Sequence, residues 1–277
     1  MYICARKLSE RTLPMGQKLK KRLQIFFRYK DLMMLLVERD IKLRYRRSVL
    51  GWVWSVLNPL LDMLVKVIVF SYFFSRNIPN YPVYLISGQL MYQFMRESST
   101  QALRSIPDNA AMLKKIYVPK YIFTLSKINS AFVNLLYSLV ALLLVMLFTH
   151  VKFTFWWFMI VIPIAELYVF CVGLGLLLAA GNVFFRDIGN IWGVVTLAWM
   201  YLTPIFYDVD ILSPRVRLWM PRLNPLYMYI RQIRDFILLG SWERYMLTIR
   251  GGYVALLMLG LGLFVFAKTK DKFILYI

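Results

Sequence analysis

The sequence contains very few side chains that could hold a metal ion or form a nucleophilic catalytic set. Its 277 residues include two cysteines, Cys4 and Cys171, and a single histidine, His150. Cys4 stands in a basic N-terminal segment and Cys171 in the middle of an apolar run, so we expect the two at different depths. These shortages argue against a disulfide framework, a metal cluster and a Ser/His/Asp or Cys/His catalytic set.

The sequence also lacks a phosphate-binding loop and has few acidic residues. No G-x-x-x-x-G-K-[ST] stretch occurs, so this chain has no P-loop for ATP. Asp208 and Asp210 are close in sequence, but no second acidic cluster joins them, as a metal site for prenyl-diphosphate chemistry would require. We therefore expect a conduit or scaffold rather than an enzyme, with no catalytic residue, metal or cofactor in this chain.

Apolar residues, by contrast, are abundant and gathered in long runs. Hydrophobic residues make up 60% of the chain, whereas a soluble domain has about 45–50%. Runs long enough to cross about 30 Å of hydrocarbon lie near 53–74, 82–103, 124–148, 155–180, 188–207 and 251–267. The second run is the weakest candidate, because it carries Gln89, Gln93, Arg96 and Glu97, and Pro204 interrupts the fifth. The sequence thus predicts an all-α membrane protein with six transmembrane helices.

The basic residues indicate a membrane surface and an orientation. The net charge is +20, and most basic residues flank apolar runs, so membrane lipids explain them better than nucleic acid does. Residues 1–52 carry 14 Lys and Arg against 4 acidic residues, and residues 96–127 carry six. Because basic residues concentrate on the cytoplasmic side, we predict that both termini are cytoplasmic.

The segment before the first span reads as an amphipathic helix on the cytoplasmic membrane surface. We expect residues 1–52 to form a cytoplasmic tail and this interface helix, ahead of a transmembrane domain at 53–267 and a cytoplasmic tail at 268–277. Apolar side chains form a helical stripe within 17–47, at Leu32, Leu35, Leu36 and Leu43. Basic residues beside the stripe are positioned for lipid phosphates: Arg39, Lys42, Arg44, Arg46 and Arg47. The alternative is an ordinary surface anchor.

The segment 208–250 is too polar to span the membrane and too apolar to be a free loop. Pro214, Pro221 and Pro225 divide it into short helices. Its seven Arg residues would favour the cytoplasm, but long loops follow the positive-inside rule poorly. We predict short re-entrant or outer helices between spans five and six; a surface anchor is the alternative.

Two opposite charges lie inside the first apolar run. Asp62 and Lys66 are four residues apart, which places them on one helical face in the order that favours pairing. They either line a wet pathway or form a neutralised pair between helices. Other polar residues inside the spans are Glu166, Asn129 and Asn134, for which interhelical hydrogen bonds are the favoured interpretation.

Aromatic residues concentrate at the ends of several predicted spans. The plain interpretation of each one is the interfacial aromatic belt of membrane proteins. The alternative is a track for sugars, because aromatic rings offer flat apolar faces to sugar C–H groups. The candidates for such a channel lining include Tyr72, Phe73, Phe74, Trp199, Tyr201, Phe206 and Tyr207.

Four stretches together resemble the membrane subunits of ABC exporters for cell-surface polysaccharides, the O-antigen and teichoic-acid type. RDIKLRYRRSVLGWVWSVLNPLLDMLV, residues 39–65, resembles the family's interface helix and first span, through a Leu-Gly-x-x-Trp and an Asn-Pro at Leu50, Gly51, Trp54, Asn58 and Pro59. The other similar stretches are NAAMLKKIYVPK (109–120), NVFFRDIGNIW (182–192), and YLTPIFY (201–207) followed by NPLYMYIRQIRD (224–235).

The resemblance implies a half-transporter in a bacterial cytoplasmic membrane. Two copies would form a channel above two copies of a separate ABC ATP-binding subunit, which would bind ATP and magnesium. A coupling helix at 105–120 would dock into that ATPase, and the gate helices would lie at 208–250. The residues implied at the ATPase contact are Asn109, Lys114, Lys115 and Tyr117.

The resemblance also implies a cargo and a channel. The cargo would be an undecaprenyl-diphosphate-linked polysaccharide, and Arg39, Arg44, Arg46 and Arg47 would guide its pyrophosphate or else hold anionic lipids. Spans one and five would line the channel, with the Asp62–Lys66 pair on its face. Two alternatives remain: a related permease for a drug or simple lipid, and a membrane-bound glycosyl or prenyl transferase.

Overall fold

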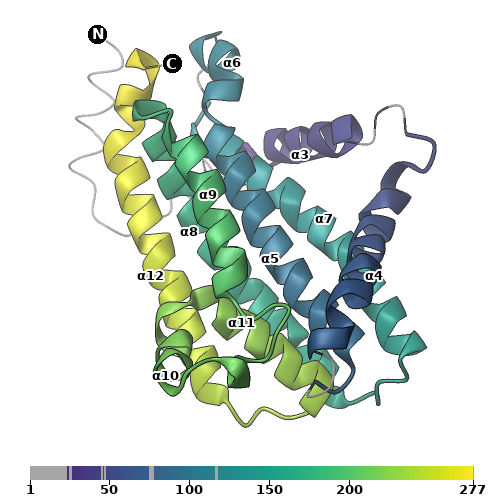
Figure 1. The fold of residues 1–277 in the computed structure, drawn as a ribbon. Coiled ribbons are helices and arrows are strands. Elements are labelled where there is room, and N and C mark those ends of the chain that lie inside the picture. Colours follow the sequence, from purple (N-terminus) through teal and green to yellow (C-terminus); the bar gives the residue numbers. More distant parts are fainter. Residues whose placement is uncertain are drawn as a thin grey trace.

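The computed structural model describes residues 24, 27–44, 46, 48–74, 78–115 and 118–276. All regular secondary structure in these residues is helical, which confirms the all-α class. The bundle consists of α4 (Trp54–Phe74), α5 (Tyr81–Arg104), α7 (Tyr121–Phe148), α8 (Val161–Phe184), α9 (Ile188–Leu202) and α12 (Tyr245–Thr269) (Figure 1). Each of the six apolar runs of the sequence therefore forms one helix of this bundle.

Within the described residues, four segments are both long and apolar enough to cross a membrane. They are Gly51–Tyr72, Tyr121–Phe148, Phe155–Phe184 and Tyr245–Leu275. Helix α5 has 24 residues but is more polar, and α9 is apolar but has only 15 residues. The protein is thus a multi-pass helical membrane protein, while the count of six spans stays a prediction.

Helix α9 is shorter than the sequence run at 188–207 indicated. It ends at Leu202, and Thr203 already has an extended backbone with ψ of 131°. The residue that follows is Pro204, whose ring disfavours the helical conformation of the residue before it. Residues 203–207 therefore leave the helix and are free to make contacts with other segments.

Shorter elements cover the two ends of the bundle. The end that carries α6 (Ala110–Lys115) also carries η3 (Pro107–Asn109) and the C-terminal η7 (Lys270–Leu275), and α3 (Lys30–Arg44) lies across the bundle near it (Figure 1). We call this the α6 end. The opposite end, the α10 end, carries η5 (Val209–Ile211), α10 (Pro214–Leu223), α11 (Pro225–Arg234) and the π-helical η6 (Asp235–Leu239).

Helix α5 forms the centre of the bundle, which explains why it tolerates polar residues. It packs against α4, α7, α8, α9 and α11, and 17 of its 24 residues are buried. Polar side chains in a membrane are tolerated where they face other helices rather than lipid. The polarity that made this run the weakest candidate span is thus a sign of its central position.

The backbones of helices α8 and α12 lie against each other at two glycines. A methyl group added to Gly262 would overlap the backbone of Gly173, and one added to Gly173 would overlap the backbone of Met258 and Leu259. Small residues at such crossings let helix backbones touch in membrane proteins. Gly260, on the same helix as Gly262, has no atom within 4 Å of the corresponding position.

We expect Gly262→Ala to lower the thermal unfolding temperature of the purified protein by several degrees. The new methyl group must push two backbones apart, and overpacking of this kind costs about 1–3 kcal/mol. The matched control is Gly260→Ala, which should be neutral or stabilising, since alanine favours a helix over glycine by about 1 kcal/mol. Equal melting temperatures for the two variants would show that the glycine contact does not hold α8 to α12.

Candidate functional site

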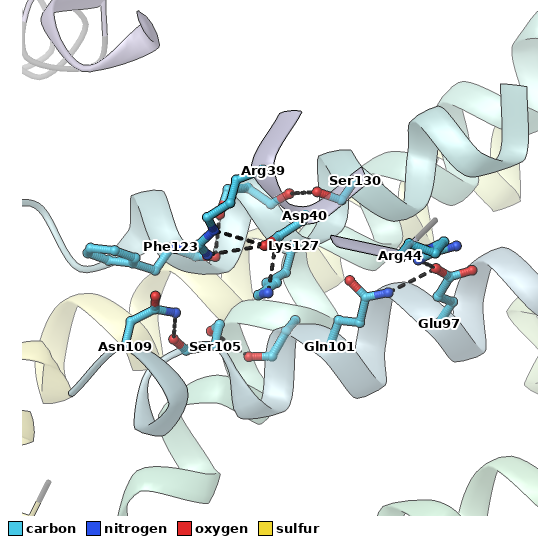
Figure 2. Close-up of polar contacts among 12 residues, drawn as sticks. Arg39, Asp40, Arg44, Glu97, Gln101, Ser105, Asn109, Phe123, Lys127 and Ser130 are labelled. Carbon is cyan, nitrogen blue, oxygen red and sulfur yellow. Dashed lines mark hydrogen bonds and ion pairs between the residues drawn. The ribbon is translucent and has the colours of Figure 1, made fainter. Parts of the chain in front are cut away.

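Helix α3 is fixed to the bundle through a carboxylate on the central helix. Arg44, the last residue of α3, forms an ion pair with Glu97 of α5 (Figure 2). Gln101, one turn further along α5, donates to the same carboxylate at 2.8 Å, and Asn134 of α7 donates to its other oxygen at 3.1 Å. Glu97 thus connects three helices and is saturated by donors.

A second ion pair holds the middle of α3. Asp40 lies 2.8 Å from the ammonium of Lys127 on α7, and Arg39 lies 3.1 Å from the same carboxyl group (Figure 2). Both partners of the Asp40–Lys127 pair are largely buried, where an unpaired charge would be costly. The position of α3 across the bundle is therefore set by two charge contacts as well as by apolar packing.

These contacts divide the basic residues that were predicted to bind lipid phosphate into those with a carboxylate partner and the rest. Arg39 and Arg44 have carboxylate partners, and Lys42 pairs with Glu38 one turn earlier at 2.6 Å. Arg46 is exposed, and Arg47 lies outside the described residues. Of the predicted leucine stripe, Leu36 is buried and Leu32 is half-buried, whereas Leu35 and Leu43 are exposed.

The segment predicted to couple to an ATPase is built on a hydrogen-bonded turn at the end of α5. The hydroxyl of Ser105 lies 2.9 Å from that of Thr124 on α7, and Asn109 donates to the Ser105 carbonyl at 2.8 Å (Figure 2). Asn109 is buried, whereas Lys114 and Lys115 of α6 are exposed. Asn109 therefore shapes the turn, and the two lysines face outward; Tyr117 lies outside the described residues.

The C-terminal η7 packs against the start of α7, close to the coupling segment. Phe273 is fully buried there, in an apolar cluster with residues of α3, α7 and α8. The ammonium of Lys120 donates to the Lys270 carbonyl and lies 5.3 Å from the Phe273 ring centre. Burial lowers the pKa of Lys120. The C-terminal turn thus supports the base of the coupling segment.

Asp62 and Lys66 form the pair that their spacing predicted, and α5 joins it. The Lys66 ammonium lies 2.6 Å from the Asp62 carboxylate, and the side-chain amide of Gln89 donates to the same oxygen. Lys66 also lies 5.7 Å from the Phe206 ring centre. Half of the Asp62 side chain is exposed. The cluster thus joins α4 to α5 and leaves the paired carboxylate of Asp62 half exposed.

The aromatic residues proposed to line a channel fall into two groups. Tyr72 and Tyr201 are exposed, at 80% and 60%. Phe206 is buried against Phe70 and Tyr201, while Trp199 and Tyr207 are half-buried and hydrogen-bonded. Phe73 and Phe74 end α4, and their side chains lie outside the described residues. Among the aromatic candidates whose side chains are described, the two tyrosines are the accessible ones in a single copy.

The remaining polar residues of the predicted spans make the interhelical hydrogen bonds that the sequence indicated. Asn129 of α7 accepts from the Tyr168 hydroxyl of α8 at 2.6 Å. Glu166 of α8 accepts from the Gln232 amide of α11 at 2.9 Å. Together with the bond from Asn134 to Glu97, these contacts confirm that interpretation.

The α10 end is closed by a buried arginine that the sequence analysis did not single out. Arg234 of α11 is 3% exposed, and its guanidinium donates to the carbonyls of Tyr84 at 2.9 Å, Pro204 at 2.8 Å and Ile205 at 3.0 Å. It also lies over the Tyr84 ring. The guanidinium fits against α5 because residue 88 is a glycine. A methyl group added to Gly88 would lie 2.6 Å from the guanidinium. One side chain thus ties α11 to α5 and to the end of α9.

Comparison with known protein families supplies an identity for this arrangement. A family model described as ABC-2 type transporter matches residues 31–238, which is 208 of the 277 residues. The chain belongs to the ABC-2 type transporter family. The match runs from α3 to the end of η6 and so includes α3, the predicted coupling segment and the short helices of the α10 end.

Several curated relatives from this family extend over most of the chain. The O-antigen export system permease protein RfbA of Klebsiella pneumoniae is 30% identical over 262 residues, 94% of this chain and 98% of the relative. The RfbA protein of Myxococcus xanthus is 32% identical over 72% of this chain and 77% of its own. The capsule polysaccharide export inner-membrane protein CtrC of Neisseria meningitidis is 27% identical over 66% of this chain and 70% of its own.

We expect Arg234→Lys to destabilise the α10 end of this ABC-2 family protein. A lysine ammonium can hold one or two of the three carbonyls, and each buried polar group left without a partner costs about 1–3 kcal/mol. The variant should melt several degrees lower and be cleaved faster by protease between α9 and α12. Arg222→Lys is the matched control, because Arg222 is exposed beside Trp219. Similar melting temperatures and cleavage rates for both variants would contradict the assigned role.

Proposed function

We propose that this chain is the transmembrane subunit of an ATP-driven exporter that moves a lipid-linked polysaccharide across the bacterial cytoplasmic membrane. The observation that carries the proposal is the similarity to an O-antigen export permease over 94% of this chain and 98% of the relative. The capsule-export relatives support the same class of cargo. An undecaprenyl-diphosphate-linked glycan, either O-antigen or teichoic acid, is the cargo proposed.

The functional unit in this proposal contains two copies of the chain. Helix α4 lies at the edge of the bundle (Figure 1), and only 17% of its apolar window is buried. It exposes Leu64, Val65 and Ile68 beside the Asp62–Lys66 pair, and α9 exposes Val194 and Leu197. A second copy placed against these faces would enclose a conduit lined by α4 and α9, with Tyr72 and Tyr201 available to sugars and Phe206 supporting Tyr201.

The proposed orientation places the α6 end in the cytoplasm. The basic segments 1–52 and 96–127 then face inward as the positive-inside rule requires, all six bundle helices cross the membrane, and α10 and α11 lie at the outer face. Exposed Lys114 and Lys115 would contact the ATP-binding subunit, with Asn109 shaping the turn. Arg46 and Arg47 are the proposed contacts for pyrophosphate, since Arg39 and Arg44 already have carboxylate partners.

ATPase activity in nanodiscs tests the proposal directly. The chain is co-expressed with its ATP-binding partner, and hydrolysis is measured with undecaprenyl-diphosphate-linked glycan, with plain phospholipid and with a drug panel. We expect a stable complex that only the glycan lipid stimulates. Stimulation by drugs or simple lipids instead would support a different ABC-2 permease, and sugar or prenyl transfer without the ATPase would support an enzyme.

A charge reversal tests the coupling contact within the same assay. Lys114→Glu with Lys115→Glu should reduce co-purification of the ATP-binding subunit, because two exposed lysines of α6 would become repulsive at a complementary surface. The control reverses two exposed basic residues assigned to the other side of the membrane, Lys152 and Arg215. Undiminished co-purification with the α6 variant would remove α6 from the interface.

The Asp62–Lys66 pair distinguishes a wet pathway from a purely structural contact. Asp62→Leu with Lys66→Leu should slow glycan export several-fold while the complex still assembles, because a hydrated path would lose its charged face. The exchange Asp62→Lys with Lys66→Asp keeps a pair on the same face and should retain more export. Export at the original rate in the double leucine variant would identify the pair as structural only.

A further inference from the structure

A polar cavity lies within one copy of the chain, beside the end of α3. Its volume is about 350 Å³, and it is bounded by the first turns of α4 and the middle of α5 and α7. The lining is mainly polar and includes Arg44, Trp54, Asn58, Gln93, Asn134 and Ser138. This volume lies within the range of small-molecule binding sites, which is about 300–1,000 Å³.

The part of the cavity lining that belongs to the described residues is close to electrically neutral. Arg44 is the charged residue that lines it, and its guanidinium is already paired with Glu97. A site for phosphate would need a cation that is free to neutralise the ligand, typically an arginine that can bind two oxygens. The charge of the lining therefore favours an uncharged ligand over a phosphate or pyrophosphate group.

Two polar side chains of the lining suit hydroxyl groups. Asn58 is exposed and Gln93 is half-buried, and neither side-chain amide has a hydrogen-bond partner among the described residues. Each amide both donates and accepts, which matches the hydroxyl groups of a sugar. The hydroxyl of Ser138 is less available to a ligand, because it is already bonded to the carbonyls of Ser55 and Asn134. Trp54 adds an aromatic ring to the wall that can pack on sugar C–H groups.

We propose that this cavity binds a sugar residue, through the amides of Asn58 and Gln93 and the ring of Trp54. This assignment rests on the proposed function, which supplies the ligand. The sugar would belong to the part of the glycan nearest its lipid anchor. The cavity lies beside the end of α3, the helix that the proposed function places at the membrane surface. A sugar residue held in the cavity would therefore lie next to the ion pair that fixes α3 to α5.

Direct binding tests the site without reference to transport. The full chain alone, in phosphatidylethanolamine nanodiscs, is mixed with a panel of methyl glycosides, and binding is read by saturation-transfer NMR. Asn58→Leu and Gln93→Leu, made separately, should each weaken binding of the best glycoside about 5- to 10-fold, as expected for one lost hydrogen bond. Asn190→Leu is the matched control, since Asn190 is also exposed and lies away from the cavity, and it should bind as the original chain does.

Unchanged binding in both cavity variants, or no glycoside bound by the original chain, would overturn the proposal. Nanodiscs that contain phosphatidylglycerol separate the two sources of a hydroxylated ligand. If that lipid displaces the glycoside at the concentration of a normal membrane, the cavity is a phospholipid headgroup site, and the assignment to glycan is overturned.

A titration of the assembled complex separates failure of this site from failure of the proposed function. ATPase stimulation is followed against the glycan lipid and against undecaprenyl diphosphate without sugar. The cavity variants should raise the half-maximal concentration about 5- to 10-fold for the glycan lipid only. Stimulation that is identical in original and variant complexes overturns the cavity site alone, whereas stimulation absent from the original complex overturns the proposed function.

Discussion

The ion pair between Arg44 and Glu97 determines how the α6 end of the molecule is assembled. A largely buried carboxylate is costly unless donors surround it, and Glu97 receives them from α3, α5 and α7. The contact fixes the end of α3, sets the wall of the polar cavity beside it and neutralises the charge that lines that cavity. Without this pair, α3 would retain the Asp40–Lys127 contact and its apolar packing, but its last turn would lose its ion pair with α5.

Helix α5 carries polar contacts along its whole length and so connects the two ends of the bundle. At the α10 end its Tyr84 carbonyl receives the buried Arg234. In the middle Gln89 reaches the charged pair of α4, and beyond Glu97 the helix ends in the turn shaped by Ser105 and Asn109. The predicted coupling segment and the helices of the α10 end are thus connected through one largely buried helix.

Local sequence patterns predicted part of this arrangement. The six apolar runs became the six bundle helices, and the spacing of Asp62 and Lys66 predicted their pair, because both depend on helical periodicity alone. The partners of Arg234 were beyond reach, since they are backbone carbonyls of two distant segments. The close helix contact was also hidden: Gly173 and Gly262 are 89 positions apart, and only the packing of α8 against α12 brings them together. The role of Glu97 was hidden for the same reason. Its partners on α3 and α7 are distant in sequence, so the sequence showed only a charge that weakened the span.

The most direct test of the account is transport itself. The chain and its ATP-binding partner are reconstituted into liposomes with undecaprenyl-diphosphate-linked glycan, and the glycan on the outer surface is measured with a lectin that cannot cross the membrane. In complexes whose ATPase faces the outer solution, added ATP should make the accessible glycan fall as it moves into the lumen. ATP hydrolysis with no change in accessible glycan would contradict the account, because the chain would then couple its ATPase to something other than movement of this polymer.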